Sequence, residues 1–575
     1  MRKSTLAILG RSFIVLTFTF IASRMAFAAS GDLDPTFNST GNPPGTVTTF
    51  IAPQMFTGAV ARAVSARPDG TIISAGASEF EWAIVAYDGA NGSLDTSFGA
   101  GGVVTEPAGD FGTATDVAIR PDNRSVVGGW GVSGLVGEYL KLVQYNSDGT
   151  RDTSFGSGGE ANYFGSSGLA SSFINALAIQ GDGKIVVAGV AYDPWNGPGG
   201  GVVIRFDSDG QLDTSFGTGG AVFVASSGLG PLQDIAIQPD GRIVVVGSIS
   251  GGLGSFGLGR LDVNGNFDPS FGLGGVVTTD LGPSSIAYAV ALQSDGKIVA
   301  GGTGSVGGAT MALARYGSDG SLDMTFGVSG IATPDFSGGI APEVLITASG
   351  KIIAVAQGLG EFALAAFDSQ GQVDTTFGVG GTVRTTIPDG GNYITSAALQ
   401  TDDKIVAAGR AFDSANSSVV FAAARYFADE PADPLTSAMA KVDALLLDPS
   451  TPAAARAPLT TARTKLDRGE MKLALVPADE VAALSQIRQA LTKLEKAIRK
   501  GLDPAAVSST MDDLSGFARV FASDAIDAAV TASGNPTRIA RAQQYLADGD
   551  AWRSAGQFEK AASEYKAALE KALSA

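Results

Sequence analysis

The sequence predicts a mainly β protein, a seven-bladed β-propeller of four-stranded blades, followed by a small all-α bundle. Three observations predict this fold class. A glycine-rich motif recurs seven times within residues 31–428, and each period holds about four short runs rich in β-branched residues. After Pro431 the composition changes to Ala, Leu, Lys and Glu. A single small sheet cannot bury both of its faces, so neighbouring sheets must stack until the ring closes.

The N-terminus has the features of a secretory signal. Arg2 and Lys3 supply the positive start, residues 13–22 are apolar, and residues 26–28 (Ala-Phe-Ala) match a cleavage site. We therefore expect residues 1–28 to be a signal peptide and the mature protein to be secreted or periplasmic, without stable membrane insertion after cleavage. A retained anchor is the alternative, although the apolar run is short for a membrane span.

The first recurring motif is D-x-x-F followed by glycines, as in GQLDTSFGTGG (210–220). The Asp is expected to accept backbone N–H groups in an Asx-turn, and the Phe to pack between adjacent sheets. The glycines supply positions that tolerate positive φ before the next strand. Because the set is present in every repeat, it indicates architecture rather than catalysis. The seven phenylalanines, spaced 51 to 61 residues apart, are Phe37, Phe98, Phe155, Phe216, Phe271, Phe326 and Phe377.

Two further motifs divide each period. One is a hairpin signal in which two β-branched runs flank a turn, as in DIAIQPDGRIVVVG (234–247). The other, as in IRFDSDG (204–210), precedes each D-x-x-F from the second copy on, and a last ARYF (424–427) has no D-x-x-F after it. The first repeat lacks the motif that precedes D-x-x-F, and the last repeat lacks the D-x-x-F itself. The chain should therefore enter and leave the ring at this point, with residues 31–37 beside residues 426–428. Whether a strand crosses over to complete a blade, or each blade is continuous, stays open.

The combination of D-x-[TS]-F-G-x-G-G with x-Q-x-D-G-K-I-V-x-x-G resembles the delta-60 β-propeller repeat of bacterial secreted and surface proteins. The resemblance covers about residues 31–428, and both halves of the motif recur in order seven times. It implies a propeller and an exported location, but little about activity. The hairpins at 123–125 and 348–350 depart from the pattern.

Composition excludes several kinds of chemistry. The chain has no Cys and no His, which removes disulfides, Cys nucleophiles, His-based triads and the usual zinc sites. Residues 431–575 carry 18 acidic and 18 basic side chains, so the net charge of −18 belongs to the repeats, and such a surface repels nucleic acid. No phosphate-binding or dinucleotide fingerprint is present. We expect no catalytic, cofactor-binding or metal-binding residues.

Calcium is the one cofactor that the sequence leaves possible. Asp207, Asp209 and Asp213 superficially resemble a calcium loop, but Gln211 occupies the third alternate position and no Glu follows at the required distance. Turn chemistry is therefore the favoured interpretation of this segment.

The parts that differ between repeats are better functional candidates than the parts that recur. The variable loop lies between the third and fourth β-rich runs of each period, and strand alternation places all seven loops on one face. Aromatic side chains in these glycine-rich loops would suit a protein, peptide or glycan ligand. The alternative is that they cap blade edges. The candidate ligand face comprises Trp82, Trp130, Tyr139, Tyr192, Trp195, Phe256 and Phe362.

Residues 29–430 are thus predicted to form the propeller and residues 431–575 an α-helical domain. Candidate helices cover 433–447, 452–468, 479–500, 503–532 and 536–573, the last breaking near Gly556. The segment from Tyr545 to Leu569 looks like a single tetratricopeptide helix pair, although Asp548 replaces the usual Leu. One such pair cannot form a peptide groove alone, so the helices either pack on themselves or dock a partner.

The sequence favours an exported, non-enzymatic propeller that acts as a binding or scaffold protein. The alternative is an extracytoplasmic hydrolase or lyase acting on a carbohydrate or lactone through carboxylates or calcium at the central channel. Convergent Asp or Glu side chains from several blades would favour the enzyme, and small apolar or hydroxyl residues a scaffold. A surface adhesin is a third interpretation, without a sorting signal to support it. The oligomeric state is not predicted.

Overall fold

The computed structural model of the chain divides it into two compact units, residues 1–430 and 431–575, which are described separately. In the described part of the chain, no helix is long and apolar enough to cross a membrane. The structure describes residues 29–574 apart from 52–57, 108–110, 134–136, 165–170, 194–196, 250–253, 305–310, 335–338, 358–359, 430–433, 449, 474–479 and scattered positions between 505 and 534.

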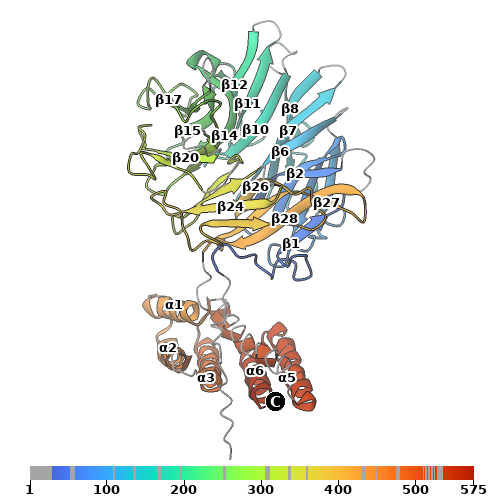
Figure 1. The fold of residues 1–575 in the computed structure, drawn as a ribbon, viewed down its shortest axis with the longest axis vertical. Helices are drawn as coiled ribbons and strands as arrows, with labels where there is room; N and C mark the ends of the chain where they lie inside the picture. The colour runs from blue at the N-terminus through green and yellow to red at the C-terminus, as the bar shows by residue number, and fades with distance from the viewer. Residues whose placement is uncertain are drawn as a thin grey trace, which may run out of the picture. The chain divides into compact units, whose positions relative to one another are not determined.

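The first unit is a propeller of seven four-stranded antiparallel blades, as predicted (Figure 1). The innermost strands are β2 (Ala59–Ala66), β6 (Phe111–Ile119), β10 (Ser171–Ile179), β14 (Leu229–Ile237), β18 (Ile286–Leu292), β22 (Val344–Ile346) and β26 (Tyr393–Leu399). The second strands are β3 (Ile72–Ser78), β7 (Ser125–Ser133), β11 (Ile185–Asp193), β15 (Ile243–Ile249), β19 (Ile298–Thr303), β23 (Ile352–Ala356) and β27 (Lys404–Asp413). The third strands are β4 (Glu81–Tyr87), β8 (Gly137–Tyr145), β12 (Gly197–Phe206), β16 (Phe256–Leu261), β20 (Met311–Tyr316), β24 (Phe362–Phe367) and β28 (Ser418–Phe427). The outermost strands are β5 (Val103–Pro107), β9 (Glu160–Tyr163), β13 (Ala221–Phe223), β17 (Val276–Thr279), β21 (Ile331–Ala332), β25 (Thr382–Thr385) and, for blade 7, β1 (Thr46–Thr49).

The ring closes by a strand that crosses over, which answers the question that the sequence left open. In Figure 1, the blue strand β1 and the orange strand β28 run side by side, and Thr46 to Thr49 pair with Ala424 to Phe421. As predicted, the first motif lies beside the end of β28, because Leu33 bridges Tyr426 and the Gly31 N–H donates to the Phe427 carbonyl at 2.7 Å. Blade 7 is therefore built from both ends of the repeat region.

Strand direction gives the propeller two different ends. At the turn end lie the hairpins between first and second strands and the D-x-x-F turns that lead to the outermost strands. At the loop end lie the loops between second and third strands and the connections to the next blade. The two ends are thus made of different parts of the repeat.

The core of the propeller lies between the blades. Each pair of neighbouring blades encloses its own hydrophobic cluster, and each cluster contains one phenylalanine of a D-x-x-F motif. All seven of these rings are at most 1% exposed. This confirms that the Phe packs between sheets, where burying a ring of this size contributes about 2 kcal/mol.

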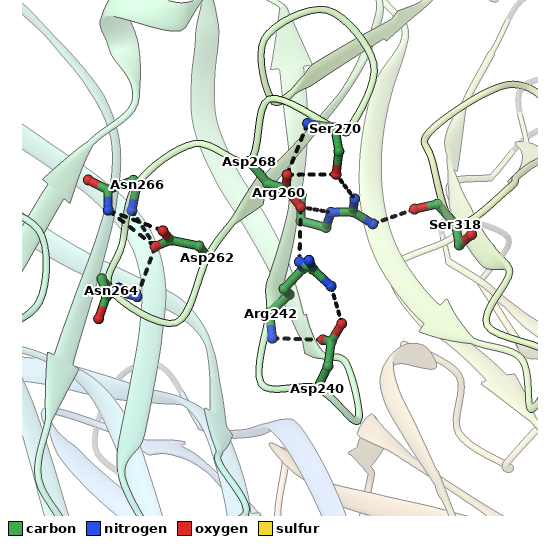
Figure 2. A network of polar contacts seen from close by, with 9 residues as sticks. All are labelled: Asp240, Arg242, Arg260, Asp262, Asn264, Asn266, Asp268, Ser270 and Ser318. Carbon is green, nitrogen blue, oxygen red and sulfur yellow. Dashed lines mark hydrogen bonds and ion pairs between the residues drawn. The ribbon is translucent and has the colours of Figure 1, made fainter.

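The Asp of the motif does more than form the predicted Asx-turn, as blade 4 illustrates (Figure 2). Asp268 Oδ1 accepts the Ser270 N–H at 3.0 Å and the Ser270 hydroxyl at 2.7 Å. Its other oxygen lies 2.9 Å from the Arg260 guanidinium and 3.0 Å from that of Arg242. Arg260 also donates to the Ser318 carbonyl in the turn of blade 5 and lies 4.6 Å above the Phe271 ring. One arginine thus connects the turn carboxylate, the buried ring and the next blade.

The same link between blades recurs around the ring from two alternative sources. In blades 3, 4, 5 and 7 the third strand supplies the arginine. Each guanidinium donates to the carbonyl of the second residue in the turn that follows the third strand of the neighbouring blade. These arginines are Arg205, Arg260, Arg315 and Arg425. In blades 1 and 2 the third strand has Ala86 and Gln144 instead, and the link comes from Arg67 and Arg120 at the end of the first strand. In blade 6, Lys351 reaches Ser30 and Ala428 across the seam.

Close packing also explains a glycine in the turn. Gly265 has φ +89°, and a Cβ there would lie 3.0 Å from the ring of Phe216 in the preceding blade and 2.9 Å from the Gly217 nitrogen. Gly320 meets Phe271 in the same way, at 3.0 Å. The recurring geometry of these turns therefore depends on the absence of a side chain at this position.

The second unit is helical, as predicted. Its helices include α1 (Pro434–Leu447), α2 (Ala453–Leu473), α3 (Glu480–Ile498), α5 (Pro536–Ser554) and α6 (Phe558–Leu573). The predicted break falls at Gly556, which has φ +67°. The pair α5 and α6 forms a helical hairpin in which a Cβ on Gly549 would meet the Tyr565 ring at 2.4 Å, and the Tyr565 hydroxyl donates to Asp550 at 2.8 Å. Residues 503–532 are described only in part.

Candidate functional site

Three of the seven residues expected on a ligand face belong to the core instead. Trp82, Phe256 and Phe362 are 0% exposed and pack in the clusters between blades. The reason is that β4, β16 and β24 begin at or before these residues, so segments interpreted as loop are the first residues of buried strands. Trp82 also donates its indole N–H to the Trp130 carbonyl at 3.1 Å. The expected exposed position does not hold for these three side chains.

Two further residues of the expected face cannot be placed as side chains. Tyr192 lies in β11, paired with Ser171, but its side chain lies outside the described residues. Trp195 lies wholly outside them. Their part in a ligand face stays a prediction.

Trp130 and Tyr139 do lie at the loop end, and each belongs to an aromatic contact. The Trp130 ring meets Phe173 of blade 3 edge-on at 5.4 Å and Phe111 of its own blade at 6.5 Å. Tyr139 packs against Phe164 at 5.3 Å. Phe111 and Phe164 are 46% and 38% exposed. We call Phe111, Trp130 and Phe173 the aromatic group.

The Trp130 and Tyr139 contacts do not form one continuous surface. Trp130 pairs with Leu140 in the blade 2 sheet, whereas Tyr139 pairs with Gly131. Successive residues of a strand point to opposite faces, so the two side chains lie on opposite faces of the sheet. The aromatic group faces blade 3, and the pair of Tyr139 and Phe164 lies on the side of blade 1.

A second concentration of polar side chains surrounds the propeller axis. Six of the innermost strands carry a β-bulge at the same position, where the register skips one residue. A bulge frees a residue from the ladder and redirects its side chain. The residues skipped are Arg62, Thr115, Asn175, Gln233, Tyr288 and Thr395.

Carboxyl groups follow this bulge in blades 2 and 4. Asp116 accepts the N–H of Val117 at 2.7 Å and that of Leu177 in blade 3 at 2.6 Å. Asp234 accepts the N–H of Ile235 at 2.7 Å and that of Val290 in blade 5 at 2.7 Å. Burial raises the pKa of Asp116 to about 6 and that of Asp234 to about 7, and the backbone hydrogen bonds offset only part of this.

Glu343, just before β22 in blade 6, is the third carboxyl group at the axis. It accepts the Ser396 hydroxyl of blade 7 at 3.3 Å. Burial and then the neighbouring Asp234 and Asp116 raise the pKa of Glu343 well above its usual value. Sequence reasoning did not identify these acids. The available signal was an Asp at the same place in two apolar inner strands, TDVAI and QDIAI (residues 115–119 and 233–237).

The acids do not have the arrangement of a metal centre. Over the described residues, no group of three or more acidic side chains is placed to hold a metal ion. The segment that resembled a calcium loop is a turn, because Asp207 Oδ1 accepts the N–H groups of Asp209 and Gln211 at 3.0 and 2.8 Å. At the outer side of the seam lies an open hollow that offers no ionisable side chain; its lining is Phe50, Ile51, Ala100, Val103, Val104 and Thr105.

The seven closed blades and the turn network define the class of the first unit as a repeat-built β-propeller. Comparison of the sequence with family models agrees. Four of the repeats match the family described as "Domain of unknown function (DUF5122) beta-propeller", over residues 120–155, 180–216, 238–271 and 293–326. The description does not use the delta-60 name. No curated protein matches the sequence.

Solved structures with similar folds are distant. A catalytically inactive virginiamycin B lyase from Staphylococcus aureus has 9% identity and a TM-score of 0.39, covering 66% of this chain and 98% of the lyase. A calcium-binding regucalcin from Agrobacterium tumefaciens has 13% identity and a TM-score of 0.31, covering 66% and 94%. A gluconolactonase from Xanthomonas campestris has 11% identity and a TM-score of 0.29, covering 53% and 90%. Likeness at this level carries no argument about function.

Proposed function

We propose that the chain is an exported, non-enzymatic propeller that binds a glycan at its loop end, with the helical unit as a module for self-packing or partner docking. The observation that carries the proposal is the aromatic group. Phe111 leaves 46% of its surface exposed while its ring is fixed edge-on against Trp130, which Phe173 holds from the next blade. Export rests on the signal-like residues 1–28.

The chemistry of the aromatic group suits a sugar better than an extended peptide. Fixed aromatic rings offer apolar contact area at low conformational cost, and their neighbours restrict the direction of approach. A peptide is usually held by a free sheet edge or by a groove. In blade 2 the outermost strand β9 lies beside β8, not beside the aromatic group, which sits on β6, β7 and β10. The ligand is therefore expected to present a flat, partly apolar face to these rings.

A glycan and peptide array probed with the full chain tests the proposal. We expect a glycan signal that falls at least about tenfold in Phe111→Ala and Trp130→Ala, as for a hot-spot aromatic side chain. Phe223→Ala is the matched control, because Phe223 is 48% exposed but lies outside the aromatic group. An array without a glycan signal, a signal on peptides alone, or equal binding by all variants would overturn it.

A second candidate function is a hydrolase or lyase that uses the carboxyl groups at the axis on a carbohydrate or lactone. It is supported by the convergence of Asp116, Asp234 and Glu343 from three blades and by their raised pKa values, which suit acid–base chemistry. Against it, both oxygens of each Asp already accept a backbone N–H, one of them from the next blade. With these contacts, Asp116 and Asp234 join neighbouring blades, which is a structural role.

Activity measurements separate the two functions. The full chain would be assayed on a panel of polysaccharides and lactones, beside Glu343→Gln and the aromatic variant Trp130→Ala. If the chain is a binding protein, neither the full chain nor either variant should turn over any substrate above background. Turnover that is lost in Glu343→Gln and retained in Trp130→Ala would replace the first proposal by the second.

A further inference from the structure

Arg62 occupies an unusual place on the innermost strand of blade 1. It is the residue skipped by the β2 bulge between Ala61 and Ala63, and its side chain is exposed to solvent. At the same position in blades 2, 3 and 7 the side chain joins neighbouring blades. Thr115 donates to the Ile174 carbonyl at 2.8 Å, and Asn175 to the Leu232 carbonyl at 2.7 Å. Arg62 instead places a cation at the axis.

A second arginine lies close by in blade 7. Arg410 on β27 pairs with Tyr393 on β26, and its guanidinium lies 5.1 Å from the centre of the Tyr393 ring. The Thr395 hydroxyl, two residues after Tyr393, donates to the Ala61 carbonyl at 2.9 Å. This bond fixes β26 beside the β2 bulge, so Arg62, Tyr393 and Arg410 are neighbours. Tyr393 starts its strand, which places the three side chains toward the loop end.

Neither arginine is neutralised by an acid. Among the residues that the structure describes, no ion pair or hydrogen bond joins Arg62 or Arg410 to another side chain. The arginines of the turn end, by contrast, donate to a carboxylate or to a carbonyl, as Arg260 does. Although Arg62 is exposed to solvent, the surrounding blades remove part of its hydration. This desolvation, together with repulsion from Arg410 and against an opposing contribution from Tyr393, lowers the pKa of Arg62. Two close cations are therefore left uncompensated in a unit that carries the chain's net charge of −18.

Two phenol groups complete the set. Tyr393 lies beside both cations, and Tyr288, the bulge residue of blade 5, is near enough to Tyr393 that burial and then this neighbour raise the pKa of Tyr288. Both side chains are partly exposed. A phenol O–H donates one hydrogen bond and a guanidinium offers a fork of donors that matches an oxyanion.

We propose that Arg62 and Arg410, with Tyr393 and Tyr288, form a binding site for a small oxyanion at the loop end of the propeller axis. The ligand is a carboxylate, phosphate or sulfate group that the two guanidiniums share, with the phenols as additional donors. The site uses blades 1, 5 and 7 and is independent of the aromatic group on blades 2 and 3. An anion there would remove the repulsion between the arginines and connect three blades around the axis.

Calorimetric titration of the full chain tests the site. The titrants are inorganic phosphate, sodium sulfate and sodium acetate, each added at pH 7 in a chloride buffer of low ionic strength. We expect saturable binding of at least one of them with one anion per chain, weakened about tenfold or more in Arg62→Gln and in Arg410→Gln, as when one partner of a charged hydrogen bond is removed. Preference among the titrants separates a carboxylate ligand from a tetrahedral anion.

Two further variants keep the result interpretable. Arg384→Gln is the matched control, because Arg384 is a surface arginine on the outermost strand β25 of blade 6. It should leave the affinity unchanged. Arg62→Lys keeps the charge but loses the fork, so its affinity should lie between those of the wild type and Arg62→Gln. Unfolding curves check that each variant folds. The absence of saturable binding of all three anions, or equal affinity in folded Arg62→Gln, Arg410→Gln and Arg384→Gln, would overturn the proposal.

Discussion

Blade 4 contains two carboxylates with opposite electrostatics, Asp268 at the turn end and Asp234 at the axis. Burial alone would raise the pKa of Asp268, but hydrogen bonds from Ser270 and the charges of Arg260 and Arg242 outweigh it, and the net shift is downward. Asp234 has two backbone N–H groups and no cation, so burial raises its pKa to about 7. The decisive difference is the counter-charge, because Asp268 is buried and Asp234 is partly buried, so both carboxyl groups lose hydration.

This contrast follows the division between what recurs and what varies. The turn-end carboxylate is present in every repeat and is supplied with its own cation or hydroxyl donor. The axis carboxyls occur only in blades 2, 4 and 6, and the axis cation Arg62 only in blade 1. Repeated charges are compensated within the blade, whereas the unrepeated charges at the axis are left uncompensated. The side chains at the axis are therefore the part of the propeller in which the blades differ from the repeated pattern.

The largest loss of stability is expected when the cation Arg260 is removed from the turn end. In Arg260→Met, Asp268 would remain 7% exposed with only Arg242 as a charged partner. We expect the free energy of unfolding at pH 7 to fall by about 3–5 kcal/mol, since a buried charge that loses its partner is strongly destabilising. Urea unfolding at pH 7 measures this. Arg384→Met, on the surface of β25, should change stability by less than about 0.5 kcal/mol. Equal effects of the two substitutions would contradict the account.

The repeated packing of the turn end can be tested by filling one glycine. In Gly265→Ala the new Cβ meets the Phe216 ring at a residue with φ +89°, and we expect a loss of about 2–3 kcal/mol from backbone strain and overpacking. Gly274→Ala is the control, because φ there is +63° but nothing lies within 4 Å. It should cost about 1 kcal/mol, the strain alone. Gly320→Ala should match Gly265→Ala, and a difference between these two would show that the turns are not equivalent.

The sequence predicted this repeated part well because its signal is summed over seven copies. The Asx-turn, the buried phenylalanines and the position of the seam all followed from D-x-x-F and from the incomplete first and last repeats. The arginine links were missed, although Arg205, Arg260, Arg315 and Arg425 stand at one place in the third motif. A charge that is fully buried in the fold looks like a surface charge in a single sequence.

The candidate sites were poorly predicted because their residues occur once. The sequence pattern predicts a loop at Trp82, but β4 begins at Glu81 and the indole is buried. Arg62 and Tyr288 share a position only because both strands bulge there, and a bulge has no sequence signature in this chain. Sites that assemble from single residues of different blades need the ring geometry, which a periodic pattern does not supply.

The two sets of carboxyl groups also predict opposite responses to pH. The lowered pKa values of turn residues such as Asp268 stabilise the fold above about pH 4, and this stabilisation is lost as pH falls through their folded pKa values. The raised pKa values at the axis mean that the folded protein binds more protons than the unfolded chain between about pH 4 and 7. Stability should therefore decline as pH rises through that window.

Asp234→Asn isolates the axis contribution. We expect the decline in unfolding free energy between pH 4 and 7 to shrink by about 2 kcal/mol, a figure discounted for the water that reaches a half-buried group. Urea unfolding across this range measures the slope. Asn175→Ala, which removes the Asn175 hydrogen bond to the Leu232 carbonyl without removing a titratable group, should shift the curve but keep its slope. If the unfolding free energy of the wild type rose steadily from pH 4 to 7, the proposed contrast between the turn-end and axis carboxyl groups would be wrong.

The smallest effect tests whether the blades are interchangeable parts. In blade 2, Arg120 reaches the Ser208 carbonyl at 2.9 Å from the first strand, and Gln144 on the third strand holds Asp152 at 2.7 Å. Blade 3 has the reverse arrangement, with Gln180 on the first strand and Arg205 on the third. Arg120→Gln alone should cost about 1–2 kcal/mol, because it removes a charged donor to a part-buried carbonyl. The double variant with Gln144→Arg should return to within about 0.5 kcal/mol of the wild type, since the new guanidinium recreates the blade 3 link. A double-mutant cycle on urea unfolding gives the coupling directly. Additive losses would mean that each blade's link depends on its own surroundings and that the turn end is less modular than its repetition indicates.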